Sequence, residues 1–363
     1  MKLINYTLLF LILGLGWTES YGQKFSNEFL SIGIGARARG MGNATVASTN
    51  SVFASFWNPA ALGALDIDQP QFGAMHTEQF AGVAKFDYLG AVLPLSKFDR
   101  KFAVSLIRFG IDDIPNTLSL FEADGTVNFD NIVPFSAVDY AFLGSYAQKL
   151  STKSGNLYVG GNAKIIYRQI GPFANSWGFG IDASLLYFGK KWRVGLVVKD
   201  ATNTFNAWSF SLSDEEKNVL SLSGNELPIN SVEKTSPEIT LGIARPFALN
   251  KKWNLLVEMD WIATTDGQRN TLISADPVSF DLAVGAELDF KDLVFFRLGV
   301  NNFQKESNFD TPSFLTIQPN LGIGLKIQQF RIDYAFTDVG EQRNQTYSHV
   351  ISLIYSLKSK GGY

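Results

Sequence analysis

The stretch Ser279–Phe290, SFDLAVGAELDF, alternates between apolar and mostly small or acidic residues. One face of an extended chain would carry the apolar side chains Phe280, Leu282, Val284, Ala286, Leu288 and Phe290. The other face would carry Asp281, Ala283, Gly285, Glu287 and Asp289. A period of two is that of a β-strand, and strands of soluble sandwiches usually span only about five or six residues. The stretch therefore predicts a long strand with one face against an apolar medium.

The same alternation recurs from Asp66 onward, and aromatic residues stand at the ends of the apolar faces. The pairs are Trp177 and Tyr187, Trp253 and Trp261, and Tyr347 and Tyr355. Two aromatic girdles bounding an apolar band are typical of outer-membrane barrels. The opposite faces carry Asp, Glu, Lys, Arg, Ser and Gly, which suit a polar or plugged lumen.

About 14 such strands can be counted, and their connections alternate between short turns and longer loops. That alternation is expected for an up-and-down barrel. The fold class is therefore all-β: a transmembrane outer-membrane antiparallel β-barrel of about 14 strands. The expected strands are 67–77, 84–95, 101–110, 136–150, 155–170, 175–189, 192–202, 237–249, 252–264, 277–290, 293–301, 314–328, 330–339 and 345–357.

The Gly- and Ala-rich stretch Leu30–Gly63 cannot build a core of its own, because it offers too little apolar surface. We expect it to lie inside the barrel as a hatch or plug. Two arginines there, Arg37 and Arg39, would then face lumen carboxylates and hold the segment without an apolar core. The alternative is solvated arginines in a mobile tail. The candidate carboxylates are Asp139, Asp182, Glu258, Asp260, Asp281, Glu287 and Asp333.

Four segments are expected along the chain. Residues 1–22 resemble a secretory signal peptide, with Lys2 before an apolar run that is too short to span a bilayer. Residues 23–65 would form the hatch segment, 66–357 the barrel, and 358–363 a periplasmic tail. The N-terminus is also expected in the periplasm.

Little in the sequence indicates catalysis or a cofactor. The chain has no cysteine, two histidines and a net charge of −3, so neither thiol chemistry nor nucleic-acid binding is indicated. His349 lies near Ser348 and Ser352, but no acid partner stands at a useful spacing. The clusters Asp112-Asp113 and Asp214–Glu216 lack the spacing of a calcium loop. We therefore expect no enzyme, no metal and no cofactor, and read Gly33, Gly35, Gly40 and Gly42 as packing or turn glycines.

The expected extracellular loops 111–135 and 203–236 contain several apolar side chains. Such residues are costly on a surface unless they cover the lumen or meet a partner. The candidates for partner binding are Leu120, Phe121, Phe205, Trp208 and Phe210.

The N-terminal stretch resembles the signature of the PorV/PorQ family, outer-membrane proteins of the type IX secretion system of Bacteroidetes-type bacteria. The residues concerned are Gly35–Ala44 (GARARGMGNA), Val46–Ser48, Phe56, Leu62 and the hatch candidates Arg37, Arg39, Gly40, Gly42, Trp57, Asn58, Pro59 and Ala60. More distantly, the chain is similar to the FadL long-chain fatty-acid channels, which share the Asn-Pro-Ala element, an N-terminal hatch and a barrel of 14 strands.

The resemblance implies a non-enzymatic component of type IX secretion in the outer membrane of a Gram-negative bacterium. Its expected partners are outer-membrane lipid and lipopolysaccharide, and the translocon, cargo or attachment complex at its extracellular face. The alternative is a FadL-like channel that passes hydrophobic small molecules, such as long-chain fatty acids, through the barrel wall. In that case a hydrophobic ligand is expected.

Overall fold

The computed structural model describes residues 26–79, 82–96, 100–122, 124–151, 155–224, 226–308, 311–337 and 347–358. The expected signal peptide lies outside these residues, as does most of the tail from 358. Sixteen strands form one antiparallel sheet. They are β1 (Gln71–Gln79), β2 (Ala84–Ser96), β3 (Arg100–Asn116), β4 (Val133–Ser151), β5 (Asn156–Ile170), β6 (Ala174–Phe188), β7 (Arg193–Lys199), β8 (Thr204–Phe210), β9 (Ser231–Thr235), β10 (Glu238–Ala248), β11 (Trp253–Thr264), β12 (Ser279–Phe290), β13 (Val294–Asn308), β14 (Thr311–Ile327), β15 (Phe330–Thr337) and β16 (Ser348–Ser356).

The sheet closes on itself because β5 pairs with β6 as well as with β4. Two positions in the wall are each built from two strands. β7 and β8 pair with different halves of β6. At the next position, β10 pairs with β7, and β9 pairs with β8. Sixteen strands thus occupy fourteen positions, and the barrel of 14 strands expected from the sequence is confirmed.

The outer face carries the apolar band. On β6 the outward residues run from Trp177, which is 58% exposed, to Tyr187. Ten residues at a rise of about 3.3 Å, tilted by about 40°, span about 25 Å, the height of the apolar band of an outer-membrane barrel. Aromatic rings pair across neighbouring strands at its edges, as Tyr167 does with Trp177 and Trp253 with Phe290, both with centroids 4.7 Å apart. This is the surface of an outer-membrane protein.

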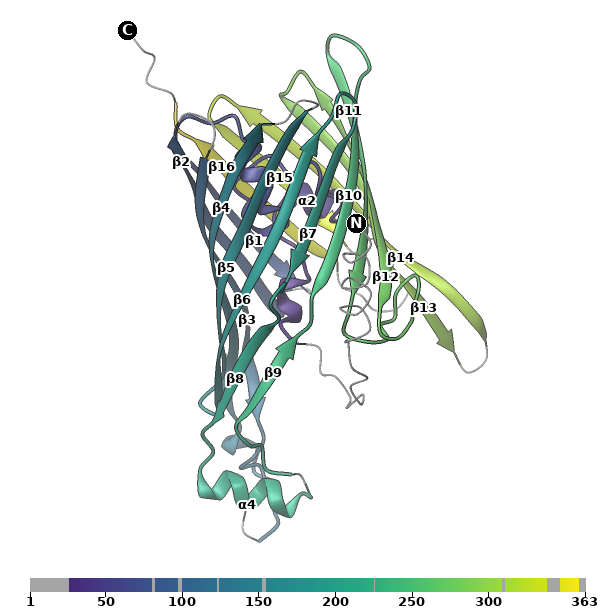
Figure 1. Ribbon diagram of the computed structural model, residues 1–363. Helices are drawn as coiled ribbons and strands as arrows, with labels where there is room; N and C mark the ends of the chain where they lie inside the picture. Colours follow the sequence, from purple (N-terminus) through teal and green to yellow (C-terminus); the bar gives the residue numbers. More distant parts are fainter. Residues whose placement is uncertain are drawn as a thin grey trace, which may run out of the picture.

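The hatch, which we define as Ser26–Leu65, lies within the barrel (Figure 1). It is built of short helices: η1 (Glu28–Leu30), α2 (Ala36–Gly40), α3 (Ala54–Trp57) and η2 (Pro59–Ala64). Two more helices, η3 (Phe129–Asn131) and α4 (Asp214–Leu222), belong to the long loops. None of the helices in the described part of the chain has the length and apolarity needed to cross a bilayer.

The long loops are shorter than expected. About a third of the stretch 203–236 is strand, because β8 and β9 pair and extend one side of the wall toward α4 (Figure 1). Likewise, β13 and β14 continue as a hairpin beyond Asn301, where the register shifts. The sequence did not reveal these extensions, since strands that project past the membrane lack the outward apolar face.

The expectation of a hatch held without an apolar core is wrong. Hatch residues such as Phe53, Phe56 and Trp57 pack into a buried apolar cluster with lumen-facing side chains of β1 to β5. The wall residues of this cluster include Met75, Phe86, Tyr88, Val92, Ile107, Leu143 and Tyr158. The lumen is therefore apolar on one side and polar on the other, a difference that strand alternation alone cannot reveal.

Candidate functional site

Arg37, on α2, reaches the polar wall. Its Nε lies 2.9 Å and its Nη2 3.0 Å from the two carboxylate oxygens of Glu287 on β12, and the guanidinium also donates to Thr45 and Ser48. Both side chains are buried. A buried carboxylate that accepts two parallel N–H bonds fixes the orientation of the arginine. Glu287 is one of the carboxylates named from the sequence, and its contact with Arg37 joins the hatch to β12.

Glu287 is shared with the wall itself. Arg297 on β13 places its Nε 2.6 Å from Glu287 and its Nη2 2.8 Å from Asp333 on β15. Arg331 adds a bond to Asp333 at 3.0 Å. Arg39 takes a different environment, since it donates to the Ile32 carbonyl oxygen at 2.5 Å and to Thr337 at 3.1 Å. Helix α2 of the hatch therefore rests on a network that spans the three wall strands β12, β13 and β15.

A second contact holds the hatch by its backbone. The Asp260 carboxylate accepts the N–H groups of Thr45 and Val46 at 2.9 and 3.0 Å, and Glu258 accepts that of Ala47 at 2.5 Å. Both acids lie on the lumen face of β11 and are almost fully buried. Successive N–H groups of a turn form a natural site for an anion. The wall here supplies the anion, and the hatch supplies the donors.

Glycines of the wall let the hatch lie directly against it. A Cβ atom at Gly299 would overlap the carbonyl carbon of Met41, and one at Gly160 would stand 2.5 Å from the Ala60 nitrogen. On the hatch side, a Cβ at Gly40 would stand 2.9 Å from the Gly322 Cα, and Gly42 has a positive φ of 61°. Close backbone approach leaves no gap for a solute. The wall glycines that contact the hatch are Gly73, Gly160, Gly195, Gly242, Gly285, Gly299 and Gly322.

The Trp57–Ala60 element organises the other end of the hatch. Asn58 caps η2 through its own side chain, which accepts the N–H of Ala60 at 3.1 Å, and Pro59 opens that helix. The Asn58 amide also donates to the Val46 carbonyl at 2.8 Å. Trp57 donates from Nε1 to the Ile34 carbonyl at 2.7 Å. These bonds tie separate hatch turns together, so the element is the internal brace of the hatch.

Beyond the hatch, the lumen contains a cavity of ≈ 840 Å³. The hatch forms its floor through Arg39, Asn43 and Trp57, and strands β10 to β14 and the loop after β11 form its sides. Most of the residues that line it are polar or charged. The lining residues are Glu28, Ser31, Ile32, Arg39, Asn43, Val46, Trp57, Gln79, Lys199, Glu238, Thr240, Asp260, Ile262, Thr264, Gln268, Arg269, Asn270, Thr271, Asp281, Ala283, Asn301, Asn302, Gln304 and Gln318.

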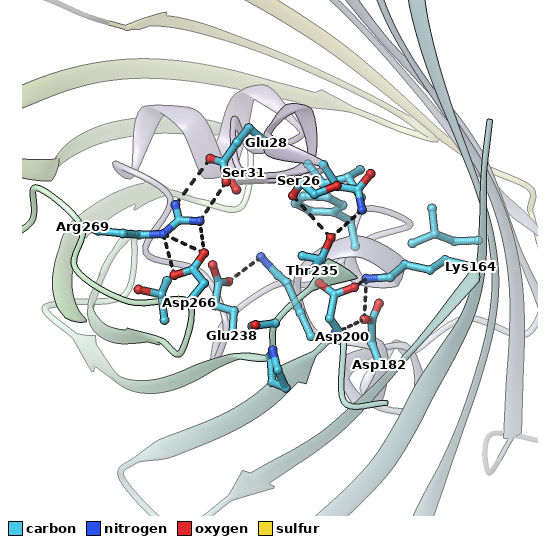
Figure 2. Close-up of a pocket in the computed structure, with 18 residues that line it drawn as sticks. Ser26, Glu28, Ser31, Lys164, Asp182, Asp200, Thr235, Glu238, Asp266 and Arg269 are labelled. Atoms are coloured by element: carbon cyan, nitrogen blue, oxygen red, sulfur yellow. Dashed lines mark hydrogen bonds and ion pairs between the residues drawn. The ribbon is translucent and has the colours of Figure 1, made fainter. Parts of the chain in front are cut away.

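A smaller pocket of ≈ 60 Å³ adjoins this cavity and shares Glu28, Lys199 and Glu238 with it. In Figure 2, Arg269 lies between Glu28 and Asp266, and it is 2.8 Å from Glu28. Burial alone lowers the pKa of Arg269, but its hydrogen bonds to Asp266 and Glu28 more than offset this and raise the pKa above its ordinary value. This cation therefore stays charged and joins the hatch to the loop after β11.

The pocket lies behind an interruption of the wall. β7 ends at Lys199 and β8 begins at Thr204, while the neighbouring position breaks at Ser236-Pro237 between β9 and β10. We call the connector Asp200–Asn203 the wall break. Lys164 on β5 lies 2.8 Å from Asp182 and 2.6 Å from Asp200, and so holds the break against β6 (Figure 2).

The wall break lies at the level of the apolar band. Its Ala201 donates to the carbonyl oxygen of Ile181, which stands on β6 between Trp177 and Tyr187. Irregular backbone at membrane depth is tolerated where it is covered by protein or lines a cavity. The break therefore marks a specialised part of the wall.

The apolar residues named from the sequence as candidates for partner binding have different environments in the structure. Phe121 is 67% exposed on the β3–β4 loop, and Leu120 beside it is half-buried. Phe205, Trp208 and Phe210 lie on β8, a strand rather than a loop. Phe205 is exposed on the outer face, while Trp208 is buried beneath Arg168, whose guanidinium lies 5.2 Å from its ring centroid. The structure does not gather these side chains into one patch.

The roles of two features could not be foreseen from the amino-acid sequence. Glu258 and Asp260 were recognised as lumen carboxylates, but their N–H partners in the hatch were not foreseen. The wall break was assigned to a continuous strand 192–202 and a loop. A signal was present in the run Lys199-Asp200-Ala201-Thr202-Asn203, where no apolar residue other than Ala201 continues the alternation.

No family model matches this chain, and no curated protein matches its sequence. Solved structures do match its fold. The Ralstonia pickettii toluene transporter TbuX is 15% identical with a TM-score of 0.55 over 90% of this chain and 99% of its own. The CymD monoaromatic hydrocarbon channel is 13% identical with a TM-score of 0.56, over 93% and 100%. A Pseudomonas aeruginosa FadL homologue is 13% identical with a TM-score of 0.51, over 89% and 98%.

These identities are low, so the likeness concerns the fold. Nothing in the comparisons singles out the PorV/PorQ family. The likeness spans nearly the whole of each chain and agrees with the closed barrel of fourteen positions and its internal hatch. The chain has the fold of the FadL-like outer-membrane barrels.

Proposed function

We propose that this chain is a FadL-like channel that takes a small molecule with an apolar part from the extracellular side and releases it sideways through the barrel wall. The observation that carries the proposal is the wall break at Asp200–Asn203, which lies within the apolar band and beside the small pocket that adjoins the lumen cavity. We also propose that the termini of the mature chain lie in the periplasm. The described chain begins at Ser26 inside the barrel, where the Ser26 hydroxyl accepts a bond from Asn206 on β8 and donates one to Glu233 on β9.

The sealed floor supports a sideways route. The hatch backbone lies against wall glycines, and its buried contacts with Glu287, Asp260 and Glu258 would all have to break before a solute could pass along the axis. A path through the wall break would instead release the contacts of Lys164 with Asp182 and Asp200 and the backbone bonds of the break to β6. The sideways path is therefore the one that leaves the hatch in place.

A two-residue deletion tests this route. The wall break has four residues where its neighbour Ser236-Pro237 has two, so deletion of Ala201 and Thr202 equalises the strands. Because an even number is removed, every flanking side chain keeps its face. Proteoliposomes with the deleted form should lose uptake of a labelled long-chain fatty acid and of its alcohol, while the folded, heat-modifiable gel band persists. Deletion of Gly125 and Thr126 in the β3–β4 loop serves as the control. Unchanged uptake after closure of the break would refute the sideways route.

A second candidate function is a PorV/PorQ-like role in type IX secretion. The observation that favours it is the exposure of large apolar side chains at the extracellular end, where Phe129 is 72% and Leu222 89% exposed. Exposed apolar patches commonly mark protein interfaces. Under this proposal the loops dock the translocon, cargo or an attachment complex, while lipid and lipopolysaccharide surround the barrel.

Purification from the native outer membrane distinguishes the two candidates. Type IX secretion predicts that translocon or cargo proteins, identified by mass spectrometry, accompany the detergent-solubilised barrel. Replacement of Phe121 and Phe129 by serine should release them. A barrel that purifies without them, yet supports uptake in liposomes, favours the channel.

A further inference from the structure

We propose that the large cavity binds the head group of an amphiphile that donates hydrogen bonds and carries positive charge, such as a primary ammonium. This inference rests on the proposed channel function and names the class of molecule that the channel takes. It sets the chain apart from the toluene transporter and the monoaromatic hydrocarbon channel that share its fold.

Polar and charged side chains outnumber apolar ones around the cavity. Five of its side chains are apolar, namely Ile32, Val46, Trp57, Ile262 and Ala283, and all of the others are polar or charged. Small-molecule pockets are more often lined mainly by apolar side chains with a few polar groups. A hydrocarbon would displace water from many polar groups and offer them no hydrogen bond in return. The ligand must therefore present polar atoms of its own.

An anionic head group would meet cations that already have partners. Lys199 lies 2.9 Å from Glu238, and Arg269 lies 2.8 Å from Glu28. Arg39 donates to a hatch carbonyl and to Thr337. A carboxylate could gain one of these cations only by displacing an existing partner. The charged groups that line the cavity also include one more acid than base, counting Glu28, Glu238, Asp260 and Asp281 against Arg39, Lys199 and Arg269.

Two carboxylates of the lining have no ion-pair partner among the described residues. Asp260 is 1% exposed, and its Oδ1 has no hydrogen-bond donor in the described part of the chain, while Oδ2 receives the two hatch N–H groups. Asp281 receives a bond from the adjacent Leu282 N–H. In the register of β11 and β12, Asp260 stands opposite Ala283, which makes Asp281 its diagonal neighbour on the lumen face.

Diagonal neighbours on one sheet face stand about 7–8 Å apart, so an ammonium bonded to Asp281 also lies near the buried carboxylate of Asp260. Glu258 strengthens the demand for positive charge. It is fully buried beside Asp260, and its Oε2 also has no donor within the described residues. Adjacent buried carboxylates need a proton or a cation between them. A cationic head group bonded to Asp281 brings positive charge close to this buried pair from the cavity side.

The test compares four ligands that share one chain length. The protein in lipid nanodiscs is titrated at pH 7 with octylamine, octan-1-ol, octanoate and octane, and the signal of empty nanodiscs is subtracted. Octylammonium should bind at least tenfold more tightly than octanoate, with octanol between them and octane the weakest. Binding of octanoate or octane as tight as that of octylammonium would overturn the inference.

Two matched variants assign the preference to the cavity. Asp281→Asn removes a charge without loss of volume and touches no hatch N–H. It should therefore weaken the binding of octylammonium about tenfold and change the affinity for octanol by less than twofold. Asp289→Asn makes the same change on the same face of β12, outside the cavity lining, and should alter neither. An ammonium preference that survives Asp281→Asn also overturns the inference.

The outcomes separate this inference from the proposed function. Tight binding of octane or octanoate, with uptake that depends on the wall break, refutes the cationic head group and leaves the channel intact. Absence of binding by all four ligands, together with absence of uptake in liposomes, refutes both.

Discussion

The two walls that enclose the hatch differ in chemistry. Strands β1 to β5 present large apolar side chains such as Phe86, Tyr88 and Ile107, against which Phe53 and Trp57 pack. Strands β11 to β15 present charged groups and glycines, which receive α2 and the following turn. The apolar wall stabilises the hatch by burial, which tolerates small shifts, whereas the polar wall requires each donor to meet its acceptor. One wall supplies affinity for the hatch, and the other fixes its position.

The largest effect is expected at the polar wall. Glu287→Ala leaves the buried Arg37 and Arg297 without the carboxylate that both contact. Removal of one partner of a buried ion pair costs about 3–5 kcal/mol. Urea unfolding of the protein in micelles should register this loss, with earlier protease cleavage of the hatch. Glu215→Ala on the exposed helix α4 is the control. A loss no larger than that of the control would show that the hatch does not depend on the network.

The apolar wall should respond almost as strongly to Trp57→Ala. The ring is buried in the apolar cluster, and its Nε1 donates to the Ile34 carbonyl. The variant therefore creates a cavity and leaves the Ile34 carbonyl without that donor. The expected cost is about 3 kcal/mol, measured by the same unfolding assay. Trp177→Ala removes the same side chain from the outer face. The comparison of the walls fails if the outer tryptophan costs more than the inner one.

A smaller effect is expected from Gly299→Ala on the polar wall. The added methyl would overlap the Met41 backbone and push the hatch away. Overpacking of this kind costs about 1–3 kcal/mol. Hydrogen exchange of the hatch amides should quicken around Met41 and Gly42. Gly144→Ala, on a strand where a Cβ meets nothing nearer than 4.0 Å, should leave exchange unchanged. Equal effects at both glycines would contradict close backbone contact.

The smallest effect should come from Arg37→Lys. The charge remains, but the two parallel bonds to Glu287 cannot both form. We expect a loss of about 1 kcal/mol in unfolding free energy. Arg100→Lys at the exposed start of β3 provides the reference. A loss as large as that of Glu287→Ala would mean that bond geometry, rather than charge, holds the hatch.

Much of the fold followed from local pattern. The alternation in Ser279–Phe290 gave its lumen and lipid faces correctly, and the aromatic spacing from Trp177 to Tyr187 matched the band. The candidate site was harder to foresee. Arg37 was expected to meet one of several carboxylates, and Glu287 could not be chosen from among them, because strand alternation states which face a residue occupies but not its height in the lumen. The apolar wall was missed for a related reason, since Phe86 and Ile107 sit on strands whose outer faces are apolar as well.

By itself, the amino-acid sequence determined that this chain forms long amphipathic strands that must close around a small-residue leader, because a period of two and an apolar face between aromatic girdles have few other stable solutions. Only the tertiary structure decided which carboxylates receive the hatch, where the wall is interrupted and what lines the cavity. Those features depend on the register between strands far apart in the chain, and register is set by the closure of the whole ring rather than by any one segment.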